Sequence, residues 1–141
     1  MSKAAQVKAP WLNSRDPEVP AALTYSELSM CSRVEEMVRR YPDYIAYEFM
    51  GKCTTYAEMW KKINACAKSL KAIGIREGDK VTICMPNAPQ TLCMFYAVNM
   101  VGAIANMVHP LSAESEIAFY LRDSGSVAAI TLDQFYNKFE S

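Results

Sequence analysis

Hydrophobic positions along this chain fall alternately at helical spacing and in short unbroken runs. The clearest helical pattern covers residues 56–73, where the apolar side chains share one face. Thr55 and Glu58 have capping-box spacing, and Gly74 can take the left-handed conformation that often ends a helix. We therefore predict a capped amphipathic helix with a solvated opposite face. The lysines of that face, which we interpret as surface rather than as a phosphate site, are Lys61, Lys62, Lys68 and Lys71.

The chain ahead of this helix predicts an irregular lead-in, a helix and a hairpin. Residues 1–22 contain prolines and show no periodicity. Thr24 and Glu27 again have capping-box spacing, and the helix that they predict stops at Pro42. Residues 44–56 are rich in β-branched and aromatic side chains around a glycine turn, which is typical of a β-hairpin.

Beyond this point short β-rich runs alternate with helical patterns. Asn87 and Gln90 have N-cap spacing for a helix to about Val101, which is apolar on nearly every side and should be covered by protein. Ser112 is expected to open the next helix, and Gly125 to close it. Strands separated by one helix each pair in parallel. The prediction is an α/β fold, with an N-terminal hairpin and a largely parallel sheet flanked by helices, whose three strands cover residues 81–85, 104–108 and 127–131.

A last apolar stripe, with the spacing i, i+3, i+4 and i+7, follows the third strand. It consists of Leu132, Phe135, Tyr136 and Phe139. This spacing predicts a helix capped by Thr131 and Gln134. If this face and the apolar Leu92–Met100 helix lack cover, they favour self-association. We therefore expect a dimer or higher oligomer, with contacts from that helix or from the stripe residues Phe135, Tyr136 and Phe139, which follow Leu132.

The composition is typical of a packed domain, and it indicates which binding partners and which cell compartment to expect. Fifteen basic and fifteen acidic residues balance, so nothing attracts the chain to nucleic acid or to an anionic membrane. The most apolar stretch, residues 92–108, contains two asparagines and a glycine, and predicts a helix and a strand rather than a membrane span. Residues 1–13 hold no apolar run long enough for a signal peptide. We expect a cytoplasmic protein without a membrane span.

Five cysteines are present, and no two have the Cys-x-x-Cys spacing of a zinc or dithiol site. An odd number in apolar surroundings indicates small buried hydrophobes in a reducing compartment. Two of them, Cys84 and Cys93, could be reactive if the chain is instead a self-standing α/β interaction or redox module. That alternative remains open at this level.

A self-contained nucleotide site is not indicated. The first parallel strand is followed by Met-Pro-Asn-Ala-Pro at 85–89, whereas a dinucleotide fingerprint needs glycines there. His109, the single histidine, follows the second strand, but no cysteine or second histidine accompanies it in the sequence. A structural hydrogen bond is a better interpretation of His109 than metal binding or catalysis. We expect no catalytic, cofactor-binding or metal-binding residue in this chain.

Six segments, in order, resemble the beginning of the adenylate-forming superfamily, which comprises acyl- and aryl-CoA synthetases, luciferases and the adenylation domains of peptide synthetases. The similarity covers about residues 23–133. The segments are 40–47 with Arg-Tyr-Pro-Asp at its start, 54–59 (Thr-Thr-Tyr-Ala-Glu-Met), 74–81 (Gly-Ile-Arg-Glu-Gly-Asp-Lys-Val), 85–87 (Met-Pro-Asn), 101–110 with Val-Gly-Ala-Ile and His-Pro, and 121–125 (Leu-Arg-Asp-Ser-Gly).

The resemblance implies that residues 23–141 form an incomplete N-terminal portion of an AMP-binding synthetase domain. It implies a ligase that activates a carboxylic acid, a fatty or aryl acid, as an acyl-adenylate and transfers it to CoA. ATP, Mg²⁺ and CoA are implied for the full-length family. The Val-His-Pro-Leu stretch at 108–111 departs from the form typical of peptide-synthetase domains and favours an acyl-CoA synthetase. The family's phosphate loop, ribose aspartate and catalytic lysine have no counterpart here, so the segment alone is expected to be inactive.

Overall fold

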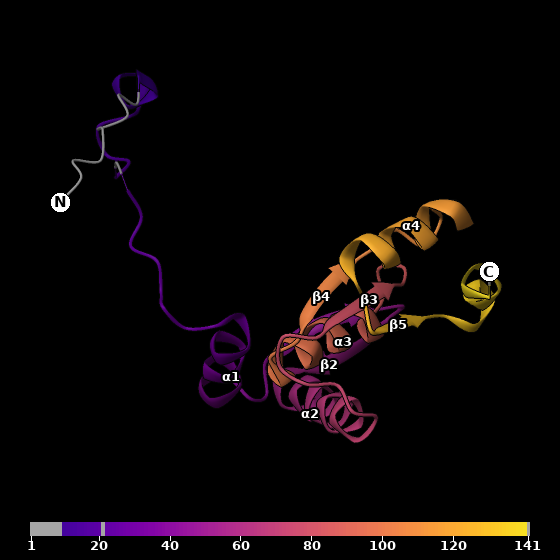
Figure 1. Ribbon diagram of the computed structural model, residues 1–141. Helices are drawn as coiled ribbons and strands as arrows, with labels where there is room; N and C mark the ends of the chain where they lie inside the picture. The colour runs from indigo at the N-terminus through magenta and orange to yellow at the C-terminus, as the bar shows by residue number, and fades with distance from the viewer. Residues whose placement is uncertain (1–9, 21, 141) are drawn as a thin grey trace.

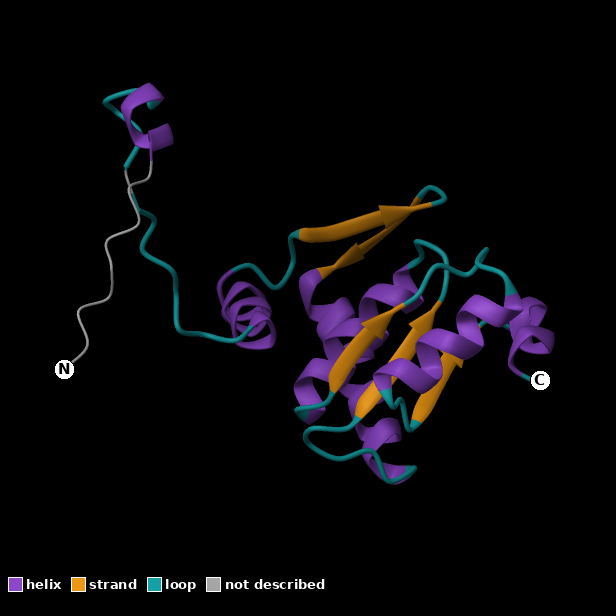
Figure 2. Cartoon of the chain, turned by 45° about the horizontal axis from the view of Figure 1, so that its top comes forward, coloured by secondary structure: helices purple, strands orange, loops and turns teal. Residues whose placement is uncertain are grey.

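The computed structural model describes residues 10–20 and 22–140, and it contains a two-stranded and a three-stranded sheet with helices packed around them (Figures 1 and 2). Residues 10–20 and 22–28 extend away from this body (Figure 1). In chain order the elements are η1 (Pro10–Ser14), α1 (Met30–Arg40), β1 (Ile45–Phe49), β2 (Lys52–Thr55), α2 (Tyr56–Ala72), β3 (Lys80–Cys84), α3 (Pro89–Val101), β4 (Ile104–Met107), α4 (Glu114–Ser124), β5 (Ala128–Thr131) and η2 (Asp133–Phe139).

The predicted hairpin is confirmed. β1 and β2 pair antiparallel and are joined by a two-residue turn at Met50 and Gly51. Both turn residues have positive φ, 51° and 77°, as a turn matching the right-handed twist of the strands requires. Thr55 then caps α2: its hydroxyl accepts from the Glu58 N–H at 3.3 Å, and the Glu58 carboxylate accepts from the Thr55 N–H at 3.0 Å. The predicted capping box is therefore present.

The predicted parallel sheet is also confirmed, with strand order β4-β3-β5. β3 is central, and its successive side chains point to opposite faces. Val81 and Ile83 pack against α2 and α3 in the main apolar cluster. Cys84 packs against Ile117 of α4 on the other face. Helices thus cover both faces of the sheet, α2 and α3 on one side and α4 on the other (Figure 2).

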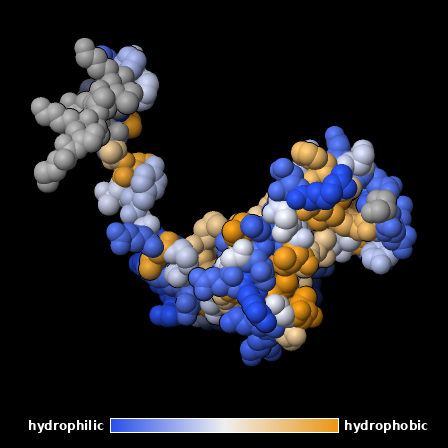
Figure 3. All heavy atoms as spheres, in the orientation of Figure 1, coloured by the Kyte–Doolittle hydropathy of each residue, from blue (hydrophilic) through white to orange (hydrophobic). Residues whose placement is uncertain are grey.

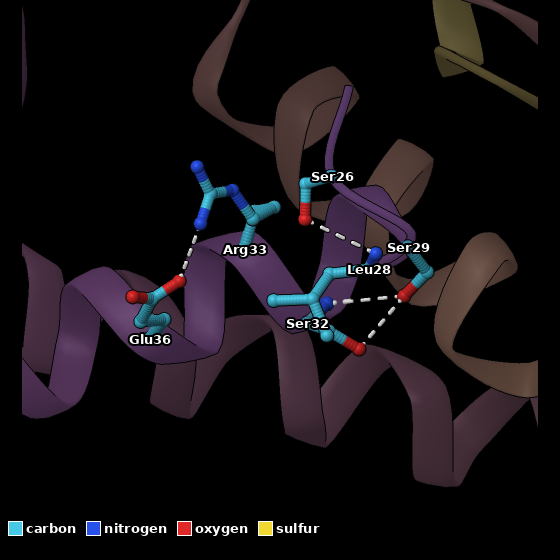
Figure 4. A network of polar contacts seen from close by, with 6 residues as sticks. All are labelled: Ser26, Leu28, Ser29, Ser32, Arg33 and Glu36. Atoms are coloured by element: carbon cyan, nitrogen blue, oxygen red, sulfur yellow. Dashed lines mark hydrogen bonds and ion pairs between the residues drawn. The ribbon is translucent and has the colours of Figure 1, made fainter. Parts of the chain in front are cut away.

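The predicted start of the first helix is wrong. α1 begins at Met30, and its N-cap is Ser29, whose hydroxyl accepts from the Ser32 N–H at 3.1 Å (Figure 4). The capping-box spacing of Thr24 and Glu27 does not open a helix, because the apolar side chains of that segment find nothing to pack against; Leu28, for example, is half exposed. Local capping stabilises a helix only where tertiary packing supports it.

The starts of α3 and α4 also differ from the prediction. The N-cap of α3 is Ala88 rather than Asn87, because Pro89 at the first helical position keeps the preceding residue out of the helical conformation. α4 begins at Glu114 rather than Ser112, with the Glu116 carboxylate accepting from the Ala113 N–H at 3.0 Å. The closing glycines, Gly74, Gly102 and Gly125, all have the expected positive φ.

The C-terminal stripe does not form the predicted capped α-helix. Residues 133–139 form the 3-10 helix η2, which has no side-chain cap. The Thr131 hydroxyl donates instead to the Cys84 carbonyl at 3.0 Å, across the sheet. Phe139 packs against the cluster beneath α4, whereas Tyr136 is 59% exposed. The stripe is therefore divided between core and surface. A second 3-10 helix, η1, lies within the lead-in that we expected to be irregular.

Candidate functional site

The carboxyl ends of the three parallel strands meet at one edge of the sheet, where α/β proteins commonly place ligands. After β3 the chain turns through Pro86, whose carbonyl accepts from the Thr91 hydroxyl at 2.5 Å. Pro89, at the start of α3, has no N–H to offer to an anion. This edge therefore lacks the glycine-lined, N–H-rich turn that cradles phosphate in dinucleotide-binding proteins.

His109 lies exposed after β4 and is engaged locally. Its Nδ1 accepts from the Leu111 N–H at 3.2 Å, and its carbonyl accepts from the Ser112 N–H at 3.1 Å. An Nδ1 that accepts a hydrogen bond carries no proton, so Nε2 holds the proton in the neutral ring. The structure thus gives His109 the turn-stabilising hydrogen bond that the sequence suggested.

Lys138 of η2 also contacts the turn that follows His109. Its ammonium donates to the carbonyls of Pro110 and Ser112, both at 2.9 Å, and lies 5.7 Å from the centre of the Phe135 ring. An ammonium with two carbonyl acceptors and an aromatic face has most of its hydrogen-bonding capacity used. Sequence reasoning missed this contact, since nothing in the spacing of residues 110 and 138 indicates it.

A largely apolar groove of about 460 Å³ opens between the hairpin and the start of α3. Its floor and walls include Tyr47, Phe49, Phe95 and Tyr96, and Glu48 is the one acidic residue on its lining. The groove contains no titratable cluster. It can accept an apolar group, and Glu48 is the one carboxylate beside it.

A polar cluster under α4 was not anticipated from the sequence. The buried Thr82 hydroxyl lies 2.7 Å from the Ser126 hydroxyl and accepts from the Asn106 amide at 2.9 Å. The same amide reaches the Ser124 hydroxyl at 3.2 Å, and Ser124 donates to the Leu121 carbonyl at 3.2 Å. Because Ser124 uses its hydrogen there, Ser126 must donate to Ser124, 2.8 Å away, and Thr82 to Ser126. The only available signal was a threonine and an asparagine in otherwise apolar strands.

All five cysteines are free thiols. Cys31, Cys84 and Cys93 are buried and Cys66 is partly buried, but Cys53 is exposed on β2, so the prediction that every cysteine is buried is wrong there. Two-residue alternation on a two-stranded sheet turns Cys53 to solvent while Thr54 is buried.

Burial sets the reactivity of the buried thiols. Burial raises the pKa of the Cys84 thiol above its usual value. The positive charge of Lys138 lowers this pKa, but by less. Burial also raises the pKa of Cys93, with a further increase from the nearby Cys66 and an opposing effect from Lys62. A thiol with a raised pKa is a poorer source of thiolate near neutral pH. This disfavours the alternative of a redox module in which Cys84 or Cys93 is the reactive group.

Among residues 10–20 and 22–140, no three or more His, Cys, Asp or Glu side chains are grouped so that they could hold a metal ion. Over the same residues, no helix is both long enough and apolar enough to cross a membrane. Residues 10–20 and 22–140 therefore present a scaffold with an apolar groove and a buried polar cluster.

The fold is that of the N-terminal subdomain of adenylating enzymes. It superposes on the N-terminal subdomain of Klebsiella oxytoca NpsA with a TM-score of 0.71 and 27% sequence identity, covering 74% of this chain and 27% of that one. It superposes on a fatty acyl CoA synthetase of Mycobacterium tuberculosis with a TM-score of 0.68 and 27% identity, covering 79% of this chain and 28% of that one.

Sequence comparison gives the same result. The profile of the family described as AMP-binding enzyme matches residues 34–140, most of the chain. A long-chain-fatty-acid–CoA ligase of Bacillus subtilis is 32% identical over 133 residues, and another, FadD13 of Mycobacterium tuberculosis, is 42% identical over 76 residues. These matches cover 94% and 54% of this chain. The chain belongs to the AMP-binding enzyme family, and it spans 24% and 15% of these relatives' own length.

Proposed function

We propose that this chain is the leading segment of an ATP-dependent acid–thiol ligase whose substrate is a fatty or aryl acid. The observation that carries the proposal is the family match over residues 34–140, together with relatives named as long-chain-fatty-acid–CoA ligases. In the proposed reaction a carboxylate attacks the α-phosphate of ATP to give an acyl-adenylate and pyrophosphate. The thiol of CoA then displaces AMP.

The residues of this chain do not fit ATP or Mg²⁺. The turn at 85–89 has no glycine and begins its helix with a proline, and the described residues contain no carboxylate cluster for a cation. We therefore assign the binding of ATP, Mg²⁺ and CoA to the part of the longer relatives that this chain does not match. The role that we assign to residues 23–141 is an incomplete portion of the synthetase domain, preceded by a lead-in over residues 1–22.

A chimeric enzyme tests the proposal. The matched leading quarter of the Bacillus subtilis ligase would be replaced by this chain, and acyl-CoA formation would be followed with a long-chain fatty acid, ATP and CoA. We expect the chimera to form acyl-CoA, because the chain has the fold of the N-terminal subdomain of adenylating enzymes and is 32% identical to the segment that it replaces. A folded chimera without activity on fatty or aryl acids would contradict the proposal.

The chain alone should neither bind ATP tightly nor activate a carboxylate. Isothermal titration calorimetry of residues 1–141 with MgATP, and a pyrophosphate-release assay with fatty acids, measure both. Micromolar binding of MgATP would overturn this part of the proposal.

We also propose that the isolated chain self-associates. The apolar residues at its surface include Leu92 of α3, which is 37% exposed, and the more exposed Tyr136 of η2. Apolar side chains interrupt the hydrophilic surface over α4 and the sheet (Figure 3). The formal net charge is zero, so little repulsion opposes association. Of the stripe residues that we expected in the contact, Phe139 is engaged internally and Phe135 is half-buried beside the Lys138 ammonium, which leaves Tyr136 as the better candidate.

Light scattering across micromolar concentrations tests association. Tyr136→Glu and Leu92→Glu place a charge on each candidate surface, and Lys68→Glu, on the solvated face of α2, is the matched control. A monomeric parent at all concentrations would contradict the proposal, and an oligomer unchanged by both substitutions would exclude these contacts.

Finally, five free thiols agree with the reducing cytoplasm, which we propose as the compartment.

A further inference from the structure

A second groove, of about 490 Å³, lies beside the hairpin, where α1 meets α2 and α3. Its apolar lining includes Val34 of α1, the buried Met59 of α2 and Leu92 of α3. Arg33 is the one charged residue on that lining. Neither the family match nor the proposed function assigns this groove an occupant.

The segment that leads into α1 borders this groove without filling it. Tyr25 and Leu28 contribute to the lining, yet they are 80% and 51% exposed. Leu23, two residues before Tyr25, is also mostly exposed. The C-terminal end of the segment is fixed to the helix: the Leu28 N–H donates to the Ser26 hydroxyl at 3.2 Å, and Ser29 caps α1 (Figure 4). An apolar segment is therefore anchored at the edge of an apolar groove.

We propose that residues 22–28 form a strap that closes over this groove and buries Leu23 and Tyr25 in it. Residues 23–27 are neither helical nor in a turn. In an extended chain the side chains at 23 and 25 point to the same side, about 7 Å apart along the strand. Because the strap is covalently attached beside the groove, its effective concentration there is high.

Charge complementarity favours the strap as the occupant. Glu27 is the one charged residue of the strap, and it would face Arg33 on the groove lining. The Arg33 guanidinium donates to the Glu36 carboxylate at 2.7 Å through Nη1, and its other nitrogens can donate to a second carboxylate. Burial of two large apolar side chains opposes the entropy that the strap loses when it becomes ordered.

Closure has a consequence for self-association. Leu92 borders the groove, so a closed strap covers it and competes with association through that residue. Tyr136 is not part of this groove, and its surface stays open. The strap is independent of acyl transfer, so its failure would leave the proposed ligase role intact.

Chymotrypsin cleavage after Tyr25 measures closure in the full chain, and a peptide of residues 10–32 gives the rate for the free segment. A protease cuts only the open strap, so we expect cleavage of the chain to be slower by at least about 10-fold. Trp11, outside the strap and exposed, should be cleaved at similar rates in chain and peptide. Equal rates after Tyr25 in chain and peptide would show that the strap does not close.

Substitutions on each side of the contact identify the groove. Leu92→Glu places a charge on the groove and should remove the protection of Tyr25, whereas Lys68→Glu, on the solvated face of α2, should leave it unchanged. Leu23→Ser should also remove most of the protection, and it lies outside the packed body, so it acts without unfolding the chain. Circular dichroism checks that the Leu92 and Lys68 variants are folded. Full protection in both Leu92→Glu and Leu23→Ser would overturn the proposal.

Two further measurements separate the strap from other occupants. Glu27→Gln, compared with a peptide of its own sequence, should lose about 2-fold in protection, as an exposed ion pair contributes little. Glu18→Gln, outside the strap, is its matched control. The protection of Tyr25 should not depend on chain concentration. Protection that appears only at high concentration would mean that a second copy fills the groove, which would contradict closure within one chain.

Discussion

The two faces of the three-stranded sheet are built differently, although one strand supplies both. On the face toward α2 and α3, β3 contributes Val81 and Ile83 to a large cluster of apolar side chains. On the face toward α4, it contributes Thr82 to a hydrogen-bonded cluster, and Cys84 to a small apolar cluster with Val108 and Ile117. The first face is stabilised by the apolar area that it buries, and the second depends on satisfying its buried polar groups.

This difference determines what each face tolerates. A buried apolar side chain that is shortened loses its transfer free energy and leaves a cavity. A buried hydrogen-bonded group that loses its partner pays the desolvation of the group left behind, whereas removal of both partners can be nearly neutral. The following substitutions in neighbouring positions separate these two costs.

The largest effect is expected from Ile83→Ala. Ile83 is fully buried in the cluster with α2 and α3, so its truncation should lower the free energy of unfolding by about 3 kcal/mol. Cys84→Ala, the next residue on the other face, removes a smaller side chain and should cost about 1 kcal/mol. Urea denaturation measures both. Equal losses would show that the two faces contribute alike.

Thr82→Val tests the polar face with little change in volume. The substitution removes the acceptor of the Asn106 amide and the donor to Ser126, and should cost about 2 kcal/mol. Thr82→Ser keeps the hydroxyl and should retain the cluster. The double variant Thr82→Val/Asn106→Leu should lose less than the sum of the single losses, measured as a double-mutant cycle. Additive losses would argue against a coupled cluster.

Thr55→Ala tests the N-terminal cap of α2, one of the helices that pack on the apolar face of the sheet. Its hydroxyl is the cap acceptor of α2, and its loss should lower the free energy of unfolding by about 1 kcal/mol. Thr55→Ser keeps the acceptor and serves as the control. A loss of the same size in both variants would mean that the hydroxyl does not act as a cap.

Ala113→Ser is expected to have the smallest effect, and to be stabilising. α4 has half a capping box: the Glu116 carboxylate accepts from the Ala113 N–H, but alanine offers no side-chain acceptor in return. Serine would supply one and should raise the free energy of unfolding by about 0.5 kcal/mol. Thermal unfolding measures the gain, which Ala113→Val should not reproduce.

The sequence predicted the features that depend on local pattern and short-range chemistry. The hairpin, the capped α2 helix and the parallel pairing of β3 with β4 and β5 all follow from periodicity, capping residues and one-helix separations. The errors occurred where a distant contact or a proline decided the outcome. Thr24 and Glu27 had the spacing of a cap but no surface to pack on, and Pro89 moved the start of α3 by one residue.

The polar cluster and the Lys138 contacts could not be predicted from the sequence, for a different reason. Thr82, Asn106 and Ser124 come from three separate elements, and only the β4-β3-β5 strand order brings them together. Their identities could be read from the sequence, but their proximity could not.

The central position of β3 has a consequence for the order in which the chain folds. β3 precedes both of its neighbours in the chain, and its last residue pairs with Thr131, 47 positions later. A chain growing from a ribosome can close the hairpin and wind α2 from contacts between near neighbours. The three-stranded sheet is complete only when β5 has emerged, and long-range pairing of this kind slows folding. The local elements should therefore form first, and the sheet that unites them last.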